Sequence, residues 1–254
     1  MNSSTTRDGT AEMSPRTLAL IAGVGLLLIA FLASFAQFGV VKALVVPGDA
    51  AATVANLVAS EGLFRAGIAA FLIALMLDIV LAWALYLLLA PVNRSLALLS
   101  AWLRVAFAAV FASALVNLLD AALAVSGATP VTLQSEALQT QVLASVTAFS
   151  TGFTAIAHAI FAICNFCLGY LLIKSVNFPT LLGVLMFVAG GGYLADAFGT
   201  ILIPGYSLSI GSMTFVGEAL LVVWLLARAI KGFPSDRAAA SSTAAALRPS
   251  PSHP

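Results

Sequence analysis

The sequence predicts an all-α membrane protein: a bundle of six transmembrane helices with both termini in the cytoplasm. Hydrophobic residues make up 61% of the 254 residues and charged residues only 8%, whereas about 25% of a typical soluble domain is charged. A soluble protein of this size must cover its surface with polar groups, but a membrane protein faces lipid instead. The mean hydropathy of +1.08 agrees. Apolar runs of about 20 residues, the length that crosses a bilayer, recur along the chain.

The expected spans are helices, because helices satisfy their own backbone hydrogen bonds in lipid. The first apolar run, Leu18 to Val41, exceeds the 7–15 residues or so of a signal-peptide core, which favours an uncleaved helix over a cleaved leader. The membrane domain covers 16–232, after a polar tail at 1–15 and before a disordered cytoplasmic tail at 233–254, which is rich in Ser, Ala and Pro. The six expected spans are 17–41, 66–90, 96–125, 143–173, 180–203 and 212–231.

Lys and Arg residues are divided unequally between the two sides of the expected bundle. Lys42 and Arg65 lie on one side, and eight basic residues lie on the other. The positive-inside rule places the more basic side in the cytoplasm, so we expect a multi-pass protein of the cytoplasmic (inner) cell membrane whose main partner is the lipid bilayer. The formal net charge of +1 gives no support for nucleic-acid binding. The eight residues are Arg7, Arg16, Arg94, Lys174, Arg228, Lys231, Arg237 and Arg248.

The first external loop carries three charged residues. Pro47-Gly48 indicates a turn, and Asp49 follows it in position to cap a short helix. Glu61 precedes Arg65 by four residues, the favourable order for an ion pair along a helix. Two interpretations remain open: a structural cap over the external face, or a lid over an external cavity.

Two ionisable residues of the second and third spans are expected to pair. Asp78 lies about 12 residues above the cytoplasmic end of its span, and Arg104 lies about 10 residues above the start of the next, which places both at about 15–18 Å. A charged side chain at mid-bilayer costs about 2.5–3.5 kcal/mol, so each residue needs a partner. We therefore predict a buried, structural ion pair between Asp78 and Arg104.

The last hairpin carries two carboxylates that residue counting places at one depth. Asp196 lies 11 residues before Ser207, the middle of the expected external turn, and Glu218 lies 11 residues after it. Two carboxylates facing each other cannot both ionise cheaply, and a shared proton, a cation or a base would relieve the repulsion. His158 in the fourth span reaches a similar depth and is the expected third member. The cluster is a structural hydrogen-bonded knot, a proton or cation site, or a polar lining for a small ligand.

Small residues accompany Asp196 on the fifth span. Gly191, Ala195 and Gly199 recur every four residues, a spacing that permits close approach of two membrane helices. We therefore expect this face of the helix, and Asp196 with it, to point into the bundle.

Other chemistry-bearing residues give no signal for an enzyme. Cys164 and Cys167 have the spacing of a redox pair, but they lie inside an apolar helix without the strand–turn–helix context of such pairs. A metal site would need further ligands, and only His158 is near. The chain contains no HExxH, GxSxG or Gly-rich phosphate loop. We expect no catalytic residues, no cofactor and no metal.

Several short sequence motifs resemble those of a bacterial multi-pass membrane family known as domain of unknown function 4386. The resemblance covers residues 17 to 232 and implies a six-helix membrane protein without implying an activity. It also implies a His about one turn before Gly169-Tyr170, where this chain has Cys164 and Asn165. The motifs are 46–53 with 59–65, 91–99, 168–172, 192–196, and 217–218 with 224–226.

The sequence therefore leads to two hypotheses about function. The first is a small transporter-like protein with an intramembrane proton or cation site at Asp196, Glu218 and His158, which predicts a polar cavity between the last three spans. The alternative is a non-catalytic membrane scaffold or sensor that binds a protein partner or lipid, which predicts fully bonded carboxylates and an exposed face of small residues.

Overall fold

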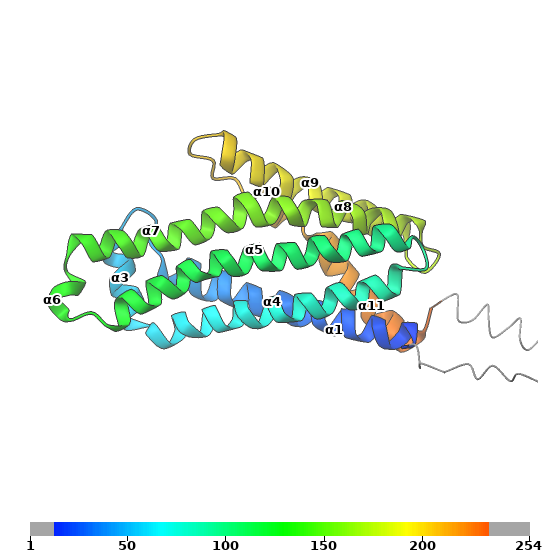
Figure 1. Cartoon of the computed structure of the whole chain (residues 1–254), viewed down its shortest axis with the longest axis horizontal. Coiled ribbons are helices and arrows are strands. Elements are labelled where there is room, and N and C mark those ends of the chain that lie inside the picture. The colour runs from blue at the N-terminus through cyan, green and yellow to red at the C-terminus, as the bar shows by residue number, and fades with distance from the viewer. Residues whose placement is uncertain (1–12, 234–254) are drawn as a thin grey trace, which may run out of the picture.

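The computed structural model describes residues 13–233, which form an elongated all-helical bundle (Figure 1). Within that range, six segments are long and apolar enough to cross a membrane, and no strand is present. The predicted all-α class with six helical segments long enough to cross a membrane is confirmed. The six segments are α1–η1–α2 (Pro15–Leu44), α4 (Glu61–Leu89), α5 (Arg94–Ser126), α7–η2–α8 (Glu136–Lys174), α9 (Thr180–Leu202) and α10–α11 (Ile210–Lys231).

Three of these segments are composite, and two short helices lie between segments. The first segment contains α1 (Pro15–Ser34), the π-helix η1 (Phe35–Val41) and α2 (Lys42–Leu44). The fourth contains α7 (Glu136–Gly152), the π-helix η2 (Phe153–Ala157) and α8 (His158–Lys174). The last contains α10 (Ile210–Thr214) and α11 (Val216–Lys231). The short helices are α3 (Ala50–Ala59) and α6 (Pro130–Leu133).

Polar side chains fix where several helices begin. Asn93 Oδ1 accepts a hydrogen bond of 3.0 Å from the Leu96 amide at the start of α5. Asp49 Oδ1 does the same for the Ala52 amide at the start of α3, at 2.9 Å. Each cap satisfies one amide that has no partner within its helix.

Both ends of the described chain lie at the same end of the bundle, here called the terminal end (Figure 1). Most of the tail expected at 233–254, and residues 1–12 of the expected N-terminal tail, lie outside the described residues. Phe233 is described and is fully buried, with its ring 6.0 Å from that of Phe178. The packed domain therefore reaches at least one residue beyond the expected boundary at 232.

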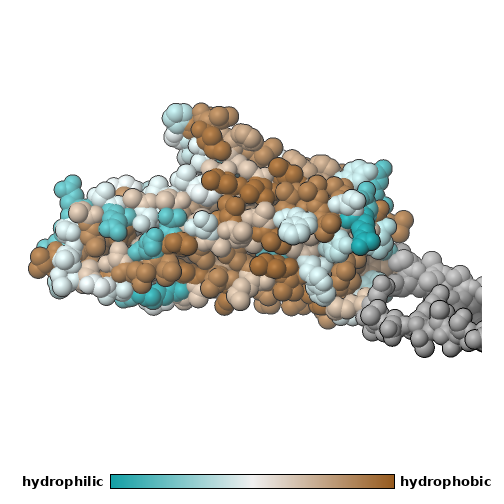
Figure 2. All heavy atoms as spheres, viewed as in Figure 1, coloured by the Kyte–Doolittle hydropathy of each residue, from teal (hydrophilic) through white to brown (hydrophobic). Residues whose placement is uncertain are grey.

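The helices differ in length, so one end of the bundle extends past the thickness of a bilayer. Helix α9 has 23 residues and the α7–η2–α8 segment has 39, or about 35 and 58 Å at 1.5 Å per residue; the hydrocarbon core is about 30 Å. The turn after α9 lies near the middle of the long axis, well short of α6 (Figure 1). On the face seen in Figure 2, hydrophobic residues gather over the middle of the molecule, and hydrophilic residues lie toward both ends.

The buried apolar side chains form two clusters separated along the long axis. The distal core contains Phe71, Phe111 and Phe149, whose rings lie 5.3–6.0 Å apart. The proximal core, nearer the terminal end, contains Leu81 and Leu171. On α4, α5 and the α7–η2–α8 segment, members of both cores flank a short stretch that belongs to neither. The polar residues described below lie in that stretch.

Glycines allow α8 and α9 to pack closely, but they are not the ones expected from the spacing. A Cβ on Gly183 would lie 2.5 Å from the carbonyl oxygen of Gly169, so the two backbones touch. Gly191 faces open space and Ala195 is exposed. Gly199 faces the ring of Tyr206 in the following turn. The expected ladder of 191, 195 and 199 is therefore wrong, because its first two members point out of the bundle.

Candidate functional site

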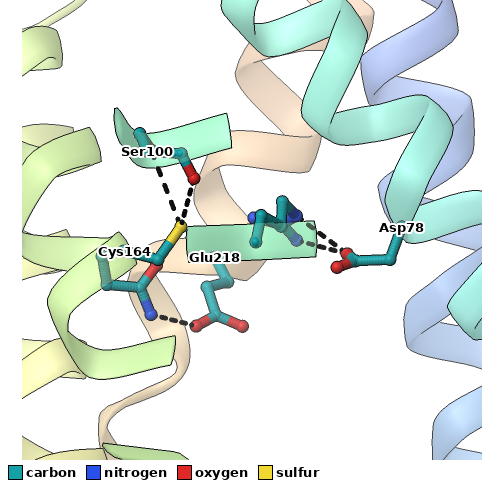
Figure 3. A network of polar contacts seen from close by, with 6 residues as sticks. Asp78, Ser100, Cys164 and Glu218 are labelled. Atoms are coloured by element: carbon teal, nitrogen blue, oxygen red, sulfur yellow. Dashed lines mark hydrogen bonds and ion pairs between the residues drawn. The ribbon is translucent and has the colours of Figure 1, made fainter. Parts of the chain in front are cut away.

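The structure brings Asp78 of α4 and Arg104 of α5 together (Figure 3). Nε and Nη2 of Arg104 each lie 2.8 Å from Asp78 Oδ1. The two side chains are only 5% and 6% exposed. The Arg104 guanidinium also lies 5.3 Å from the centre of the Phe161 ring, within the range of a cation–π contact.

The pair lies close to half the thickness of a bilayer from the terminal end. Arg104 is ten residues from Arg94 at the start of α5, and Asp78 is eleven residues from Leu89 at the end of α4. At 1.5 Å per residue both depths are about 15–17 Å, against a hydrocarbon core of about 30 Å.

Glu218 of α11 lies on the other side of Arg104 from Asp78. Together with Asn165 and Tyr193, these three residues form what we call the polar layer. Asn165 Nδ2 donates a hydrogen bond of 3.2 Å to Glu218 Oε1, and the Tyr193 hydroxyl is a second hydrogen-bonding neighbour of the carboxyl group. Arg104 attracts Glu218 electrostatically as well as Asp78. Asn165 is 1% exposed, and its Oδ1 has no hydrogen-bond partner among the described residues. One cation therefore serves two carboxyl groups, of which Asp78 is buried and Glu218 is half-buried.

Cys164 of α8, next to Asn165, contacts Ser100 of α5. Its Sγ donates to the Ser100 carbonyl oxygen at 3.4 Å and lies 3.6 Å from the Ser100 hydroxyl (Figure 3). Cys164 is buried, and both it and Cys167 are free thiols. Among residues 13–233, no three His, Cys, Asp or Glu side chains are grouped so that they could hold a metal ion.

Asp196 of α9 lies in a different environment: its side chain faces the turn that leads to α10. Its carboxylate accepts hydrogen bonds from the Tyr206 hydroxyl at 2.7 Å, the Ile210 amide at 2.9 Å and the Gly211 amide at 2.7 Å. Asp196 thus caps α10 from a neighbouring helix, which satisfies two amides that α10 leaves free. The hydrogen bond to Asp196 raises the pKa of the Tyr206 phenol, which lies in the turn outside the spans.

The expectation that Asp196 and Glu218 face each other is wrong. Gly211 lies against Tyr193 and Asp196, whereas Gly217, next to Glu218, lies against Leu185. Glu218 is therefore about two helical turns deeper than Asp196, roughly 10 Å. Residue counting failed because the chain after α9 returns alongside that helix before α10 begins, so Ser207 is not the midpoint between the two helices.

His158 lies within electrostatic reach of Asp196 but does not form a common site with both carboxylates. Its ring packs 4.4 Å from the Phe153 ring and 4.9 Å from the Tyr193 ring. Its Nδ1 is buried and has no hydrogen-bond partner in the described part of the chain. His158 is the first residue of α8, directly after η2, and single π-helical turns are frequent at functional sites.

Sequence reasoning missed two members of the layer, Asn165 and Tyr193. Both are uncharged at neutral pH, so neither carries the high cost of a charge in lipid that marks an intramembrane site. The usable signal was the position of Asn165 nine residues before Lys174, about 14 Å, the depth already assigned to Arg104.

A small cavity lies beside the layer, on the side of the terminal end. It has a volume of about 10 Å³, close to that of one water-sized sphere. Its walls come from α4, α5 and α8, so it is not the cavity expected between the last three spans. The lining residues are Ala82, Leu85, Tyr86, Leu89, Ala97, Ser100, Ala101, Arg104 and Leu171.

The three charged residues of the loop that we expected to be external make local contacts only. Asp49 caps α3, and Asn56 Nδ2 donates to the Leu44 carbonyl oxygen at 3.1 Å. Arg65 Nε lies 2.9 Å from Glu61 Oε1, with both side chains about two-fifths exposed. The Asn56 bond ties α3 to the end of α2, whereas the Glu61–Arg65 pair lies within the first turns of α4.

Six apolar spans with ionisable residues buried between them define a class: the multi-pass helical membrane proteins. More particularly, the chain belongs to the family described as Domain of unknown function (DUF4386), which matches residues 21–229. An uncharacterized protein of the archaeon Archaeoglobus fulgidus is 33% identical over 158 residues, which cover 62% of this chain and 78% of that relative. No solved structure matches this chain.

Proposed function

We propose that this protein is a small transporter-like protein of the cytoplasmic (inner) cell membrane, with an intramembrane proton or cation site centred on Glu218. The observation that carries the proposal is the ratio of charges at mid-depth: one cation, Arg104, between two carboxyl groups, Asp78 and Glu218.

The charge ratio favours uptake of a positive ion. With both carboxyl groups ionised, the layer has a net charge of −1 in a medium where an unpaired charge costs several kcal/mol. A proton or cation at Glu218 removes that charge. Asp78 is bound by two nitrogens of Arg104, whereas Glu218 has only the neutral donors Asn165 and Tyr193 in direct contact. Glu218 is therefore the member that changes state.

The distribution of basic residues supports an orientation with the terminal end in the cytoplasm. In the described part of the chain, five basic residues and no acidic residue lie at that end, and such asymmetry follows the positive-inside rule. The five are Arg16, Arg94, Lys174, Arg228 and Lys231.

Proteoliposomes that enclose a pH-sensitive dye test the proposal. Under an imposed membrane potential, wild-type protein is expected to change the internal pH, and Glu218→Gln to abolish the change, because the amide cannot ionise. Glu61→Gln is the matched control, since Glu61 is an exposed carboxyl group outside the layer. Equal responses from wild type and Glu218→Gln would refute a proton site at Glu218. Repeating the assay with Na⁺ or K⁺ gradients at constant pH distinguishes a cation from a proton.

A scaffold that binds a partner through helix faces is the second candidate. Gly191 and Ala195 leave a small-residue surface on the outside of α9, and such surfaces let another helix approach closely. Energy transfer between labelled copies in liposomes measures self-association, and Gly191→Leu is expected to weaken it. No transfer above the level of random mixing would exclude self-association through this face.

A further inference from the structure

Two arginines, one from the first helix and one from the last, lie close together at the terminal end of the bundle. We propose that Arg16 of α1 and Arg228 of α11 bind the headgroup of an anionic phospholipid whose acyl chains lie along α1. This lipid site is separate from the polar layer and does not depend on the proposed role of Glu218.

Contacts between α1 and α11 bring the two side chains together. The helices run in opposite directions and pack closely, since a Cβ on Gly23 would lie 2.9 Å from the Leu226 side chain. Arg16 lies in the first turn of α1, and its Nη2 donates a hydrogen bond of 2.6 Å to the carbonyl oxygen of Ile230. Arg228 lies in the last turn of α11, two residues before Ile230. Both arginines therefore lie where α1 begins and α11 ends (Figure 1).

Each guanidinium is held in place and has donors left for a ligand. Arg228 Nη1 donates to the Gly232 carbonyl oxygen at 3.4 Å, and its guanidinium lies 4.1 Å from the centre of the Trp224 ring. A guanidinium has several N–H donors, and Arg16 and Arg228 each donate one hydrogen bond within the described part of the chain. A planar group that is already positioned binds a phosphate through parallel hydrogen bonds with little loss of side-chain freedom.

The charge at the terminal end fits an acidic headgroup. Among the described residues, five basic and no acidic side chains lie at this end, whereas two basic and four acidic side chains lie toward the opposite end. Basic surfaces at the membrane boundary attract acidic lipids, so the charge selects the terminal end for such a lipid. The charged residues toward the opposite end are Lys42, Arg65, Asp49, Glu61, Asp120 and Glu136.

An exposed apolar stripe leads from Arg16 into the membrane. Leu20, Val24 and Leu27 follow Arg16 at intervals of three or four residues, so they lie on the same face of α1, and all three are exposed. From Arg16 to Leu27 the stripe covers about 16 Å, close to half of the hydrocarbon core of about 30 Å. A dissolved phosphate ion would contact the arginines alone, whereas the chains of a phospholipid also cover the stripe.

Quenching of tryptophan fluorescence by brominated lipid tests the site. The ring of Trp224 lies against Arg228, and it reports on the site in a Trp83→Phe, Trp102→Phe background. The protein is placed in vesicles of equal amounts of phosphatidylglycerol and phosphatidylcholine, in which only one of the two lipids carries bromine. Because the two kinds of vesicle differ only in which lipid is brominated, stronger quenching by brominated phosphatidylglycerol means that the acidic lipid is enriched beside Trp224. Trp102, exposed on α5, is the control reporter in a Trp83→Phe, Trp224→Phe background.

Arg16→Gln combined with Arg228→Gln is expected to lower the preference for phosphatidylglycerol at Trp224 at least about fivefold, because a basic residue at an acidic surface contributes about that factor. Arg94→Gln combined with Lys174→Gln is the matched control, since it removes two charges from the same end on other helices. The control should change the preference by less than about twofold, because salt screens distant charges. Arg16→Gln alone replaces the double variant if that variant does not fold.

Loss of the preference in the arginine variant but not in the control supports the site. Equal quenching of Trp224 by the two brominated lipids refutes it, and so does a preference that survives the loss of both arginines. A preference that the control variant loses equally, or that Trp102 also shows, overturns a site at Arg16 and Arg228 in favour of general attraction to the basic end. Competition by dissolved glycerol phosphate would replace the phospholipid with a soluble anion. None of these measurements involves Glu218, so the lipid site is tested separately from the proposed transport.

Discussion

Asp196 and Glu218 lie on the same hairpin, but their surroundings differ in kind. Asp196 accepts three hydrogen bonds, two of them from backbone amides that otherwise have no partner. Glu218 accepts from Asn165 and has Tyr193 beside it, and it shares its nearest cation with Asp78. The Asp196 carboxylate holds a turn together, whereas the Glu218 carboxyl group belongs to a layer with more acids than bases.

The difference shows that burial of an acid does not by itself indicate function. Asp196 is 3% exposed and its donors account for its presence, because a carboxylate with several amide donors is well satisfied. The neighbours of Glu218 do not balance its charge. Glu218, whose charge is not balanced, is therefore a better candidate for ion binding than the more deeply buried Asp196.

The largest expected effect is that of Arg104→Met, which leaves Asp78 and Glu218 without their cation. We expect the free energy of unfolding to fall by about 3–5 kcal/mol, measured by denaturation in detergent with the fluorescence of the three tryptophans. Adding Glu218→Gln to Arg104→Met should restore part of the loss if Arg104 serves both carboxyl groups. No recovery would show that Glu218 does not share the cation.

Asp196→Ala is expected to cost about 2 kcal/mol of unfolding free energy, because the Ile210 and Gly211 amides lose their acceptor. Asp196→Asn keeps one acceptor oxygen and should cost less. Neither change should abolish the pH response of proteoliposomes, provided that the protein is folded. A lost response in stable Asp196→Asn would remove the distinction between the two carboxyl groups.

Tyr206→Phe tests the turn at alkaline pH. The bond to Asp196 raises the pKa of Tyr206 on folding, so its stabilisation is complete below the unfolded-state pKa of about 10 and is lost as the pH rises through the higher folded-state pKa. Wild type is expected to lose more stability above about pH 10 than Tyr206→Phe does, as measured by denaturation at several pH values. In an Asp196→Ala background the same substitution should remove this difference; if the difference persists, Asp196 is not its cause.

Glu61→Gln is expected to have the smallest effect. Its partner Arg65 is also exposed, and such helical pairs contribute about 0.3 kcal/mol, which salt screens further. Denaturation at low and high salt gives the measurement. A loss above about 1 kcal/mol would mean that the start of α4 carries more of the stability than its contacts indicate.

The fold could be predicted because hydropathy over about 20 residues is a strong signal in lipid. Residue counting also placed Asp78 and Arg104 at one depth, because only the short turn 90–93 joins their helices. The same counting failed for Asp196 and Glu218, since seven residues separate α9 from α10 and the chain returns along α9. The partners Asn165 and Tyr193 could not be assigned from sequence, because their roles depend on how the helices are rotated about their axes.

The ion pair between α4 and α5 has a consequence for how the chain finds a single structure. Both helices consist mainly of Ala, Leu and other apolar residues, and lipid offers no hydrophobic reward for one alignment over another. Sliding α4 by one turn would exchange similar apolar contacts but would separate Asp78 from Arg104. The pair therefore selects the register of the two helices, a use of buried polar groups known from coiled coils.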